Sequence, residues 1–259
     1  MPLYGSQHEN ISAWYVDSLV KVFPDSPAAR SKLEVPLLSA RNGHTSLEVA
    51  LRSEEHRVVQ VRVVAPRLGN AALKVQTYRV GTVEVNSHPT DTPLAEVVRS
   101  EVGPYPDPLF PLAKEISLEG SRTETIWISV FTPEDTRPGI YPGAIEIDAG
   151  KRKLRLPFRV EVFAATVPKE QKLWVTNWLW FEQEMMAKHY PKLKSDPDRY
   201  WRVLENIART MAEYKQNVVF VPVRTLAKAH LADRGVQYDF GLVDRWIEIF
   251  DKAGMARMI

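Results

Sequence analysis

A group of side chains able to bind a hydroxyl-rich ligand lies in the last third of the chain. Its members are Asn177, Trp178, Trp180 and Glu182. Aromatic rings offer flat apolar faces, and amide and carboxylate groups form hydrogen bonds with hydroxyl groups. We therefore predict a substrate-binding role for this group. The alternative is that Trp178 and Trp180 pack between a strand and its helices, because residues two apart share one face of a strand.

Two more polar residues follow the next apolar run, Val218–Val223. Arg224 comes directly after this run, and His230 lies in the same predicted loop. If both runs are parallel strands of one β/α-barrel, their carboxyl ends meet at the face where active sites form. We expect Arg224 and His230 to bind substrate there, and the alternative for each is an ordinary loop residue.

Adjacent carboxylates occur twice, at Glu54-Glu55 and at Glu134-Asp135. Paired carboxyl groups can cleave glycosidic bonds, since one protonates the leaving oxygen while the other stabilises the cationic sugar. Both pairs lie in predicted turns, where Asp commonly bonds its own backbone. We interpret them as solvated turn residues, and the sequence assigns no catalytic residue.

Composition excludes several classes of function. Lys and Arg total 34 against 32 Asp and Glu, so a net charge of +2 gives no electrostatic case for a nucleic acid or membrane partner. The chain has no Cys, which excludes disulfides and thiolate sites. Its six His residues lack metal-ligand spacing, and no phosphate loop or dinucleotide fingerprint occurs. We predict no metal and no cofactor.

The first ten residues, MPLYGSQHEN, are polar and contain no apolar core of a signal peptide. No apolar run reaches the length that a membrane span needs. The sequence as given predicts a cytoplasmic protein. A secreted or periplasmic location is the alternative if the N-terminus is processed.

Residues 11–166 predict an antiparallel β-sandwich domain. Apolar and polar residues alternate at Leu47–Leu51, Val59–Val63, Ile126–Val130 and Leu154–Val162. A period of two is typical of strands with one buried face, as in antiparallel sheets. Turn residues between such strands favour a sandwich.

Three further segments of this domain carry local predictions. Residues 13–23 predict a strand that ends before Pro24. The proline-rich segment between Asn86 and Pro111 predicts a long surface connection. The segment Thr132–Gly143 contains two Pro-Gly pairs and predicts a hairpin-type turn between two strands.

Residues 167–259 predict the first (βα)2β portion of a TIM-like β/α-barrel. The apolar runs at Leu173–Phe181 and Val218–Val223 resemble buried parallel strands. Asp196 and Asp239 can cap the two helices, and Gly254 can end the second. A barrel needs eight such units and about 250 residues. We therefore expect this domain to be truncated.

Several strings resemble the glycoside hydrolase family 123 group, which includes proteins described under a domain of unknown function, 4091. They are PYPDPLFPL (Pro104 to Leu112), WISVFTPEDTRPGIYPGAIEI (Trp127 to Ile147), LPFRVEVF (Leu156 to Phe163), MAEYKQNVVFVP (Met211 to Pro222) and YDFGLVDRWIEIFDKAGM (Tyr238 to Met255). These strings span most of residues 13–259. In that family a β-sandwich precedes a catalytic β/α-barrel.

The resemblance implies a bacterial glycoside hydrolase that cleaves terminal β-linked N-acetylhexosamine, in particular N-acetylgalactosamine. It also implies a retaining, substrate-assisted mechanism, in which the 2-acetamido group of the sugar attacks the anomeric carbon. The family's catalytic Asp-Glu pair lies on a later barrel strand. No Asp-Glu dipeptide follows Phe181, so we expect the pair beyond residue 259 and this chain alone to be inactive.

Two alternatives remain at this level. One is a non-catalytic carbohydrate-binding or scaffold β-sandwich protein. The other is an α/β protein complete as given, whose small open sheet would leave unpaired edges. The expected partners are a glycan substrate and, since a partial barrel exposes apolar faces, a second copy or a partner chain that completes the barrel.

Overall fold

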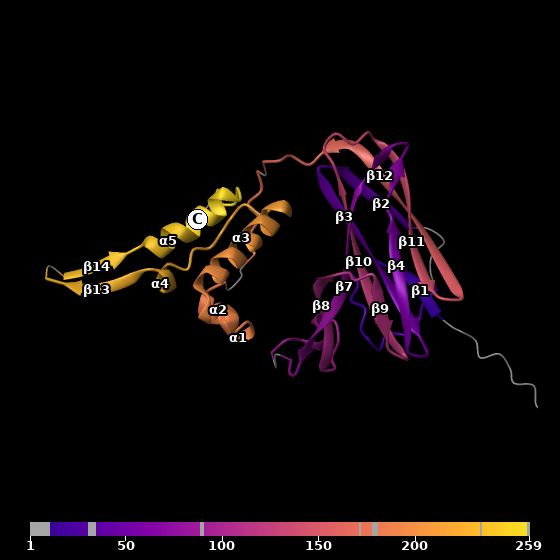
Figure 1. Cartoon of the computed structure of the whole chain (residues 1–259), viewed down its shortest axis with the longest axis horizontal. Coiled ribbons are helices and arrows are strands. Elements are labelled where there is room, and N and C mark those ends of the chain that lie inside the picture. Colours follow the sequence, from indigo (N-terminus) through magenta and orange to yellow (C-terminus); the bar gives the residue numbers. More distant parts are fainter. Residues whose placement is uncertain are drawn as a thin grey trace, which may run out of the picture. The chain divides into compact units, whose positions relative to one another are not determined.

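The structure is a computed structural model that describes residues 11–30, 35–88, 91–170, 172–177, 181–233 and 235–257. The chain divides into two compact units, Met1–Val167 and Pro168–Ile259. Strands dominate the first unit and helices the second (Figure 1).

Unit 1 contains two five-stranded sheets. In spatial order, the first sheet comprises β1 (Ile11–Val16), β3 (Gly43–Ser53), β10 (Arg122–Thr132), β7 (Lys74–Val85) and β8 (Gly103–Pro111). The second comprises β2 (Val35–Arg41), β12 (Arg152–Thr166), β11 (Gly139–Ala149), β4 (Arg57–Val64) and β9 (Glu115–Leu118). The remaining short elements are β5 (Arg67–Leu68), β6 (Ala71–Ala72) and the 3₁₀ helix η1 (Leu94–Glu96).

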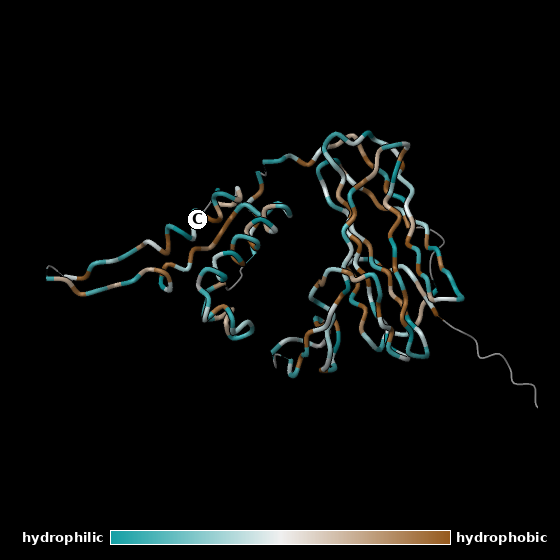
Figure 2. Tube along the Cα trace, in the orientation of Figure 1, coloured by the Kyte–Doolittle hydropathy of each residue, from teal (hydrophilic) through white to brown (hydrophobic). Residues whose placement is uncertain are grey.

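Side chains from both sheets form one hydrophobic core, so unit 1 is a β-sandwich. Fully buried members include Val49, Leu51, Ile126, Ile128 and Val130 from the first sheet and Tyr141, Ile145, Phe158 and Val160 from the second. Figure 2 shows the hydrophobic residues distributed along the strands of this unit. The sequence alternation predicted these strands, and the structure confirms them. Burial of each such side chain contributes about 1.5–3 kcal/mol to folding.

Strand pairing departs from the predicted antiparallel pattern at one place. β2 pairs in parallel with β12, in a register that sets Val35 opposite Phe158. The other ladders of the two large sheets are antiparallel. Parallel neighbours need a long connection between them, and here nearly the whole sandwich lies between β2 and β12.

The proline-rich segment before Pro111 is partly a strand, so the prediction of a surface connection over its whole length was wrong. β8 pairs antiparallel with β7, with Tyr105 opposite Val83 and Pro106 opposite Thr82. β8 is the edge strand of its sheet. Proline lacks the N–H that a central strand must donate, but an edge strand can carry it on its unpaired side.

The predicted hairpin at Thr132–Gly143 was also wrong, because β10 and β11 belong to different sheets. The connection carries the chain from one sheet to the other. Gly143 lies within β11 rather than in a turn, and a Cβ atom there would lie 2.8 Å from Cζ of Phe158. Close packing against this ring therefore requires glycine.

The strand predicted for residues 13–23 ends at Val16. The Asp17 side chain accepts a hydrogen bond from the backbone N–H of Leu19 at 2.9 Å, and its carbonyl accepts the N–H of Val20 at 2.9 Å. An aspartate that bonds the backbone two residues on forms a turn. This turn ends β1 and carries residues 17–23 away from the ladder.

Unit 2 contains helices and one hairpin. The elements are α1 (Gln183–His189), α2 (Lys192–Ser195), α3 (Pro197–Glu213), α4 (Val223–Leu226), β13 (Lys228–Ala232), β14 (Gly235–Asp239) and α5 (Gly241–Lys252). Helices α3 and α5 share a core that includes Trp201, Leu204, Trp246 and Phe250. No helix among the described residues is long and apolar enough to cross a membrane.

The predicted ends of these helices are largely confirmed. Asp196 caps α3, since its carboxylate accepts the N–H of Arg199 at 2.9 Å. At α5 the N-cap position is Phe240, one residue later than predicted, although Asp239 still accepts the N–H of Gly241 at 2.8 Å. Gly254, at φ +79°, follows the end of α5.

The strands predicted at Leu173–Phe181 and Val218–Val223 do not form a ladder in the described part of the chain. The side-chain amide of Asn217 forms hydrogen bonds with backbone groups of the first segment instead. Its Oδ1 accepts the N–H of Val175 at 2.9 Å, and its Nδ2 donates to the carbonyl of Leu173 at 3.0 Å. The backbone N–H groups of Asn217 and Val218 also donate to the carbonyl of Val175, at 3.1 and 3.3 Å. The two segments are therefore joined by the Asn217 side chain and by two backbone hydrogen bonds rather than by a ladder.

Candidate functional site

The sequence-predicted site residues lie in unit 2, and the structure describes four of them. Asn177 is exposed at the end of the segment 172–177. Trp178 and Trp180 lie outside the described residues. Their neighbour Trp174 is 55% exposed, so this aromatic side chain at least is not core packing.

Glu182 immediately precedes α1 and is half-buried. Its Oε2 atom is buried and has no hydrogen-bond partner among the described residues. The nearby Tyr200 hydroxyl donates to the carbonyl of Phe181 at 3.1 Å. Burial, and secondarily the charge of Glu182, raise the pKa of Tyr200, so this phenol stays protonated and remains a donor. A buried acceptor without a donor is unusual and calls for one, such as a water molecule or a ligand hydroxyl.

Arg224 and His230 both have exposed side chains. Arg224 lies on the short helix α4. His230 lies on β13 opposite Gln237, so the predicted loop is in fact a hairpin strand at this point. Among the described residues no hydrogen bond or ion pair joins Asn177, Glu182, Arg224 and His230. A shared pocket for them therefore stays a prediction.

One carboxylate of the two adjacent pairs, Glu54, is held in structural contacts. Ser121 Oγ donates to Glu54 Oε2 at 2.9 Å, and Arg52 lies 3.7 Å from the same carboxylate. The described residues contain no group of three or more His, Asp or Glu side chains that could hold a metal ion.

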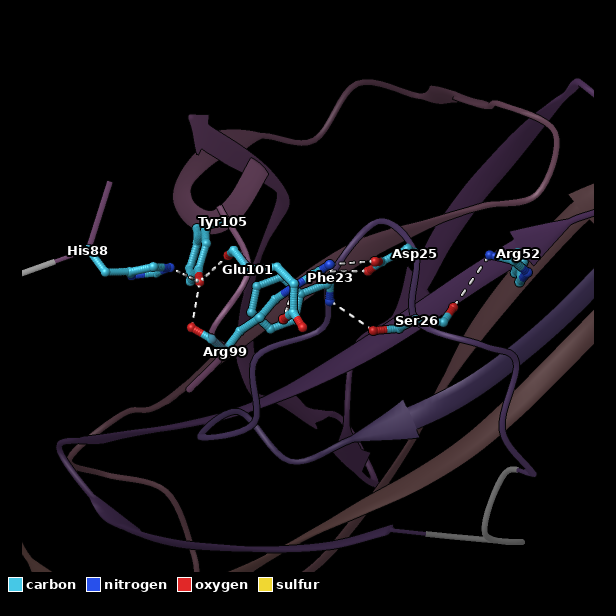
Figure 3. Close-up of polar contacts among 8 residues, drawn as sticks. All are labelled: Phe23, Asp25, Ser26, Arg52, His88, Arg99, Glu101 and Tyr105. Atoms are coloured by element: carbon cyan, nitrogen blue, oxygen red, sulfur yellow. Dashed lines mark hydrogen bonds and ion pairs between the residues drawn. The ribbon is translucent and has the colours of Figure 1, made fainter. Parts of the chain in front are cut away.

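A polar cluster of unit 1 joins the segment after β1 to the segment before β8 (Figure 3). Arg99 donates two hydrogen bonds to the Asp25 carboxylate, at 2.9 and 2.7 Å. These bonds lower the pKa of Asp25, so the carboxylate stays ionised well into the acid range. The guanidinium of Arg99 also lies 4.8 Å from the centre of the Phe23 ring.

Tyr105 completes this cluster, which we call the Arg99 clasp (Phe23, Asp25, Arg99, Tyr105). Its ring meets the Phe23 ring edge to face, with centroids 5.1 Å apart. Its hydroxyl lies 2.8 Å from the carbonyl oxygens of Arg99 and Glu101 (Figure 3). The clasp therefore fixes residues 23–26 and 99–105 against each other by charge and by aromatic packing.

Sequence reasoning missed one unusual carboxylate of the sandwich, Glu48. It is 7% exposed, and burial raises its pKa to about 7. The sequence contained a partial signal, because the alternation of Leu47, Val49 and Leu51 already placed Glu48 on the outer face of its sheet. Nothing in the sequence showed that residues 17–22 and 106–109 cover that face.

The chain is similar to family 123 glycoside hydrolases. Residues 34–149, within the sandwich, match the sequence model described as the glycoside hydrolase 123 N-terminal domain. The structure of a family 123 glycoside hydrolase from Clostridium perfringens, described in terms of glycolipid glycan hydrolysis, matches with a TM-score of 0.79 at 14% identity. That match covers 95% of this chain and 46% of the other, so this chain spans about half the length of that protein.

Other solved structures match at lower levels. The CooA pilin subunit from enterotoxigenic Escherichia coli gives a TM-score of 0.31 at 12% identity, covering 61% of this chain and 99% of its own. Spo0M, a sporulation control protein from Bacillus subtilis, gives 0.30 at 7% identity, covering 60% and 49%. At these scores the likeness carries no argument. No curated protein sequence matches the chain.

Proposed function

We propose that this chain is the sandwich and the first β/α units of a glycoside hydrolase that removes terminal β-linked N-acetylhexosamine, with N-acetylgalactosamine as the preferred sugar. The observation that carries the proposal is the match to the family 123 enzyme over 95% of this chain. The family 123 sandwich match over residues 34–149 supports the same assignment. A substrate-assisted mechanism is part of the proposal, and its catalytic carboxylates lie outside this chain.

In this proposal the segment around Asn177–Glu182 binds the sugar. The rings of Trp178 and Trp180 stack on the pyranose, and Asn177, Arg224 and His230 supply hydrogen-bonding groups. The unpartnered Oε2 of Glu182 supports an acceptor role, since a sugar hydroxyl is a donor of the kind that it lacks. Stacking contributes through burial of apolar surface, so its loss weakens binding more than chemistry.

The test of activity uses this chain and the longest protein that its reading frame encodes. Both are assayed with aryl β-N-acetylgalactosaminide and, for sugar preference, with aryl β-N-acetylglucosaminide. We expect hydrolysis only by a protein that includes the later barrel strands, with faster turnover of the galactosaminide. If the longest encoded protein hydrolyses neither compound nor a glycolipid glycan, the enzymatic proposal fails and a carbohydrate-binding or scaffold role gains support.

The site is tested by Trp178→Ala and Trp180→Ala in the active protein. We expect at least one variant to raise KM about 10-fold or more with a smaller change in kcat. Trp174→Ala is the matched control, because Trp174 lies in the same segment and its side chain is exposed. If neither site variant changes KM more than the control does, the tryptophans serve packing and the site assignment is wrong.

A further inference from the structure

A pocket of unit 1 lies on the outer face of the first sheet, and none of the residues assigned to the sugar site lines it. It has a volume of about 220 Å³. Its floor contains Glu48 and Trp127, which lie opposite each other on β3 and β10. Its walls include Val22, Pro106 and Leu109. Because cross-strand partners point to the same face of a sheet, the carboxylate and the indole share one small, largely apolar space.

Glu48 is the unusual element of this pocket. The residue is only 7% exposed, and no hydrogen bond or ion pair reaches its carboxylate from any residue that the structure describes. The carboxylate oxygens are not fully enclosed, so they can be reached through the pocket. A buried ionised carboxylate without a partner is strongly disfavoured. The charge of Lys21 offsets this cost only in part, and the charge of Asp17 adds to it.

Among the described residues that line the pocket, Lys21 is the only cationic one. Its charge acts on Glu48, but its ammonium group is hydrogen-bonded to other partners. Nζ donates to the carbonyl of Pro106 at 2.9 Å and lies 3.6 Å from the Asp107 carboxylate. Asp17 adds a further negative charge that acts on Glu48. The pocket region therefore carries three carboxylates against one ammonium group.

The wall of the pocket is held in place by the Arg99 clasp. Lys21 and Val22 directly precede Phe23, whose ring packs against Tyr105 and Arg99. Pro106 and Asp107 directly follow Tyr105 on β8. Both segments that cover Glu48 are thus anchored next to the pocket, which favours a preformed site over a transient gap.

We propose that this pocket binds a small organic cation, with its ammonium group paired to Glu48. An ammonium group supplies both the positive charge and the N–H donors that the carboxylate lacks. The indole of Trp127 and the apolar walls suit a ligand with a hydrocarbon body, since cations also associate with tryptophan rings. The volume admits a single six-membered ring. This site is independent of the proposed hydrolase activity.

The experiment titrates the whole chain at pH 8 by calorimetry with three probes of one shape. They are cyclohexylammonium, cyclohexanol and cyclohexanecarboxylate. We expect cyclohexylammonium to bind at least about 10-fold more tightly than cyclohexanol, and cyclohexanecarboxylate not to bind. Equal binding of the cation and the alcohol, or no heat with the cation, would overturn the proposal.

Two variants then test whether the cation binds in this pocket. Glu48→Gln keeps the side-chain shape and should weaken cation binding about 10-fold or more, whereas the exposed Glu84→Gln should leave it unchanged. Leu109→Trp is a second, independent variant that leaves the carboxylate intact and fills the pocket mouth, where Leu109 is 42% exposed. It should also block binding. Cation binding that survives both Glu48→Gln and Leu109→Trp would show that the pocket is not the site.

Discussion

In the two units of this chain, the backbone N–H and C=O groups of extended segments find their hydrogen-bond partners in different ways. In the sandwich, strands pair in long ladders, such as the one between β3 and β10, and neighbouring chain segments supply the partners. In unit 2, the extended segments 172–177 and 216–222 meet through the side chain of Asn217 and a few backbone contacts. A ladder spreads its stability over many hydrogen bonds, whereas a side-chain bridge concentrates it in one residue.

This difference bears on where function can reside. The sandwich has a dense core shared by two sheets, which makes it a rigid support for a preformed pocket such as that of Glu48. Unit 2 carries the segment with the predicted sugar-binding residues, and its exposed hydrophobic side chains include Leu231, Tyr238 and Phe240. Regions with few ladder hydrogen bonds open locally at lower free energy, and binding segments are commonly drawn from them.

The largest expected effect is in the sandwich core. Phe158→Ala removes a fully buried ring that packs against Gly143, so it should lower the free energy of unfolding of unit 1 by about 3–5 kcal/mol. Urea denaturation measures this change. Phe163→Ala on the same strand is the control, since Phe163 is 43% exposed and its loss should cost much less. Equal effects of the two variants would contradict a core that depends on tight packing.

Asn217→Ala tests the side-chain bridge of unit 2. It removes the acceptor of the Val175 N–H and the donor to the Leu173 carbonyl, so we expect a loss of about 1–3 kcal/mol. Hydrogen exchange should accelerate at the Val175 amide while the amides of β3 and β10 keep their protection. The exposed Asn206→Ala is the control. If Val175 keeps its protection in Asn217→Ala, a backbone ladder rather than the side chain holds this segment.

The pH dependence of stability tests the buried carboxylate of the sandwich, Glu48. Burial raises the pKa of Glu48 to about 7, above its value in the unfolded chain, so the folded state binds this proton more tightly. Its contribution to stability is thus most favourable in acid and is lost as the pH rises toward about 7. Lys21 opposes this shift and Asp17 reinforces it.

Glu48→Gln should therefore gain stability over the parent chain as the pH rises. The difference in free energy of unfolding between variant and parent should be about 1 kcal/mol more favourable to the variant at pH 8 than at pH 5. This value is reduced because the carboxylate borders a solvent-accessible pocket. Chemical denaturation at both pH values measures the difference, with Glu84→Gln as the control. An identical pH dependence in Glu48→Gln and the parent would mean that Glu48 is ionised without cost. That outcome requires a partner for its charge in the free protein.

Sequence patterns predicted the regular parts of both units and missed the features set by distant segments. The alternation at Leu47–Leu51 directly predicts a strand with one buried face. The adjacent residues Asp196 and Pro197 predict the start of a helix. The prolines of β8 resemble a loop locally, and only the position of that strand at a sheet edge makes them acceptable. Gly143 likewise resembles a turn residue until Phe158 is placed against it.

The candidate sites show the same limit. The residue types around Asn177–Glu182 suggested sugar binding, but their convergence depends on strand ends that a sequence does not place in space. The burial of Glu48 was even harder to predict, because the segments that cover it lie about 30 and 60 residues away in the chain. Unusual carboxylates of this kind are visible only once the fold is known.

The smallest expected effect on stability concerns the N-cap of α3 in unit 2. Asp196→Ala removes the acceptor of the Arg199 N–H and should lower the free energy of unfolding by about 1 kcal/mol. Asp196→Ser should restore most of the loss, because serine also caps helices. Asp198→Ala is the matched control, since that first-turn acid interacts with the helix dipole alone and should cost only a few tenths of a kcal/mol. Hydrogen exchange at Arg199 distinguishes the two. If Asp198→Ala costs as much as Asp196→Ala and exchange at Arg199 is unchanged, then α3 is held by its core contacts with α5, and unit 2 depends on shared packing as the sandwich does.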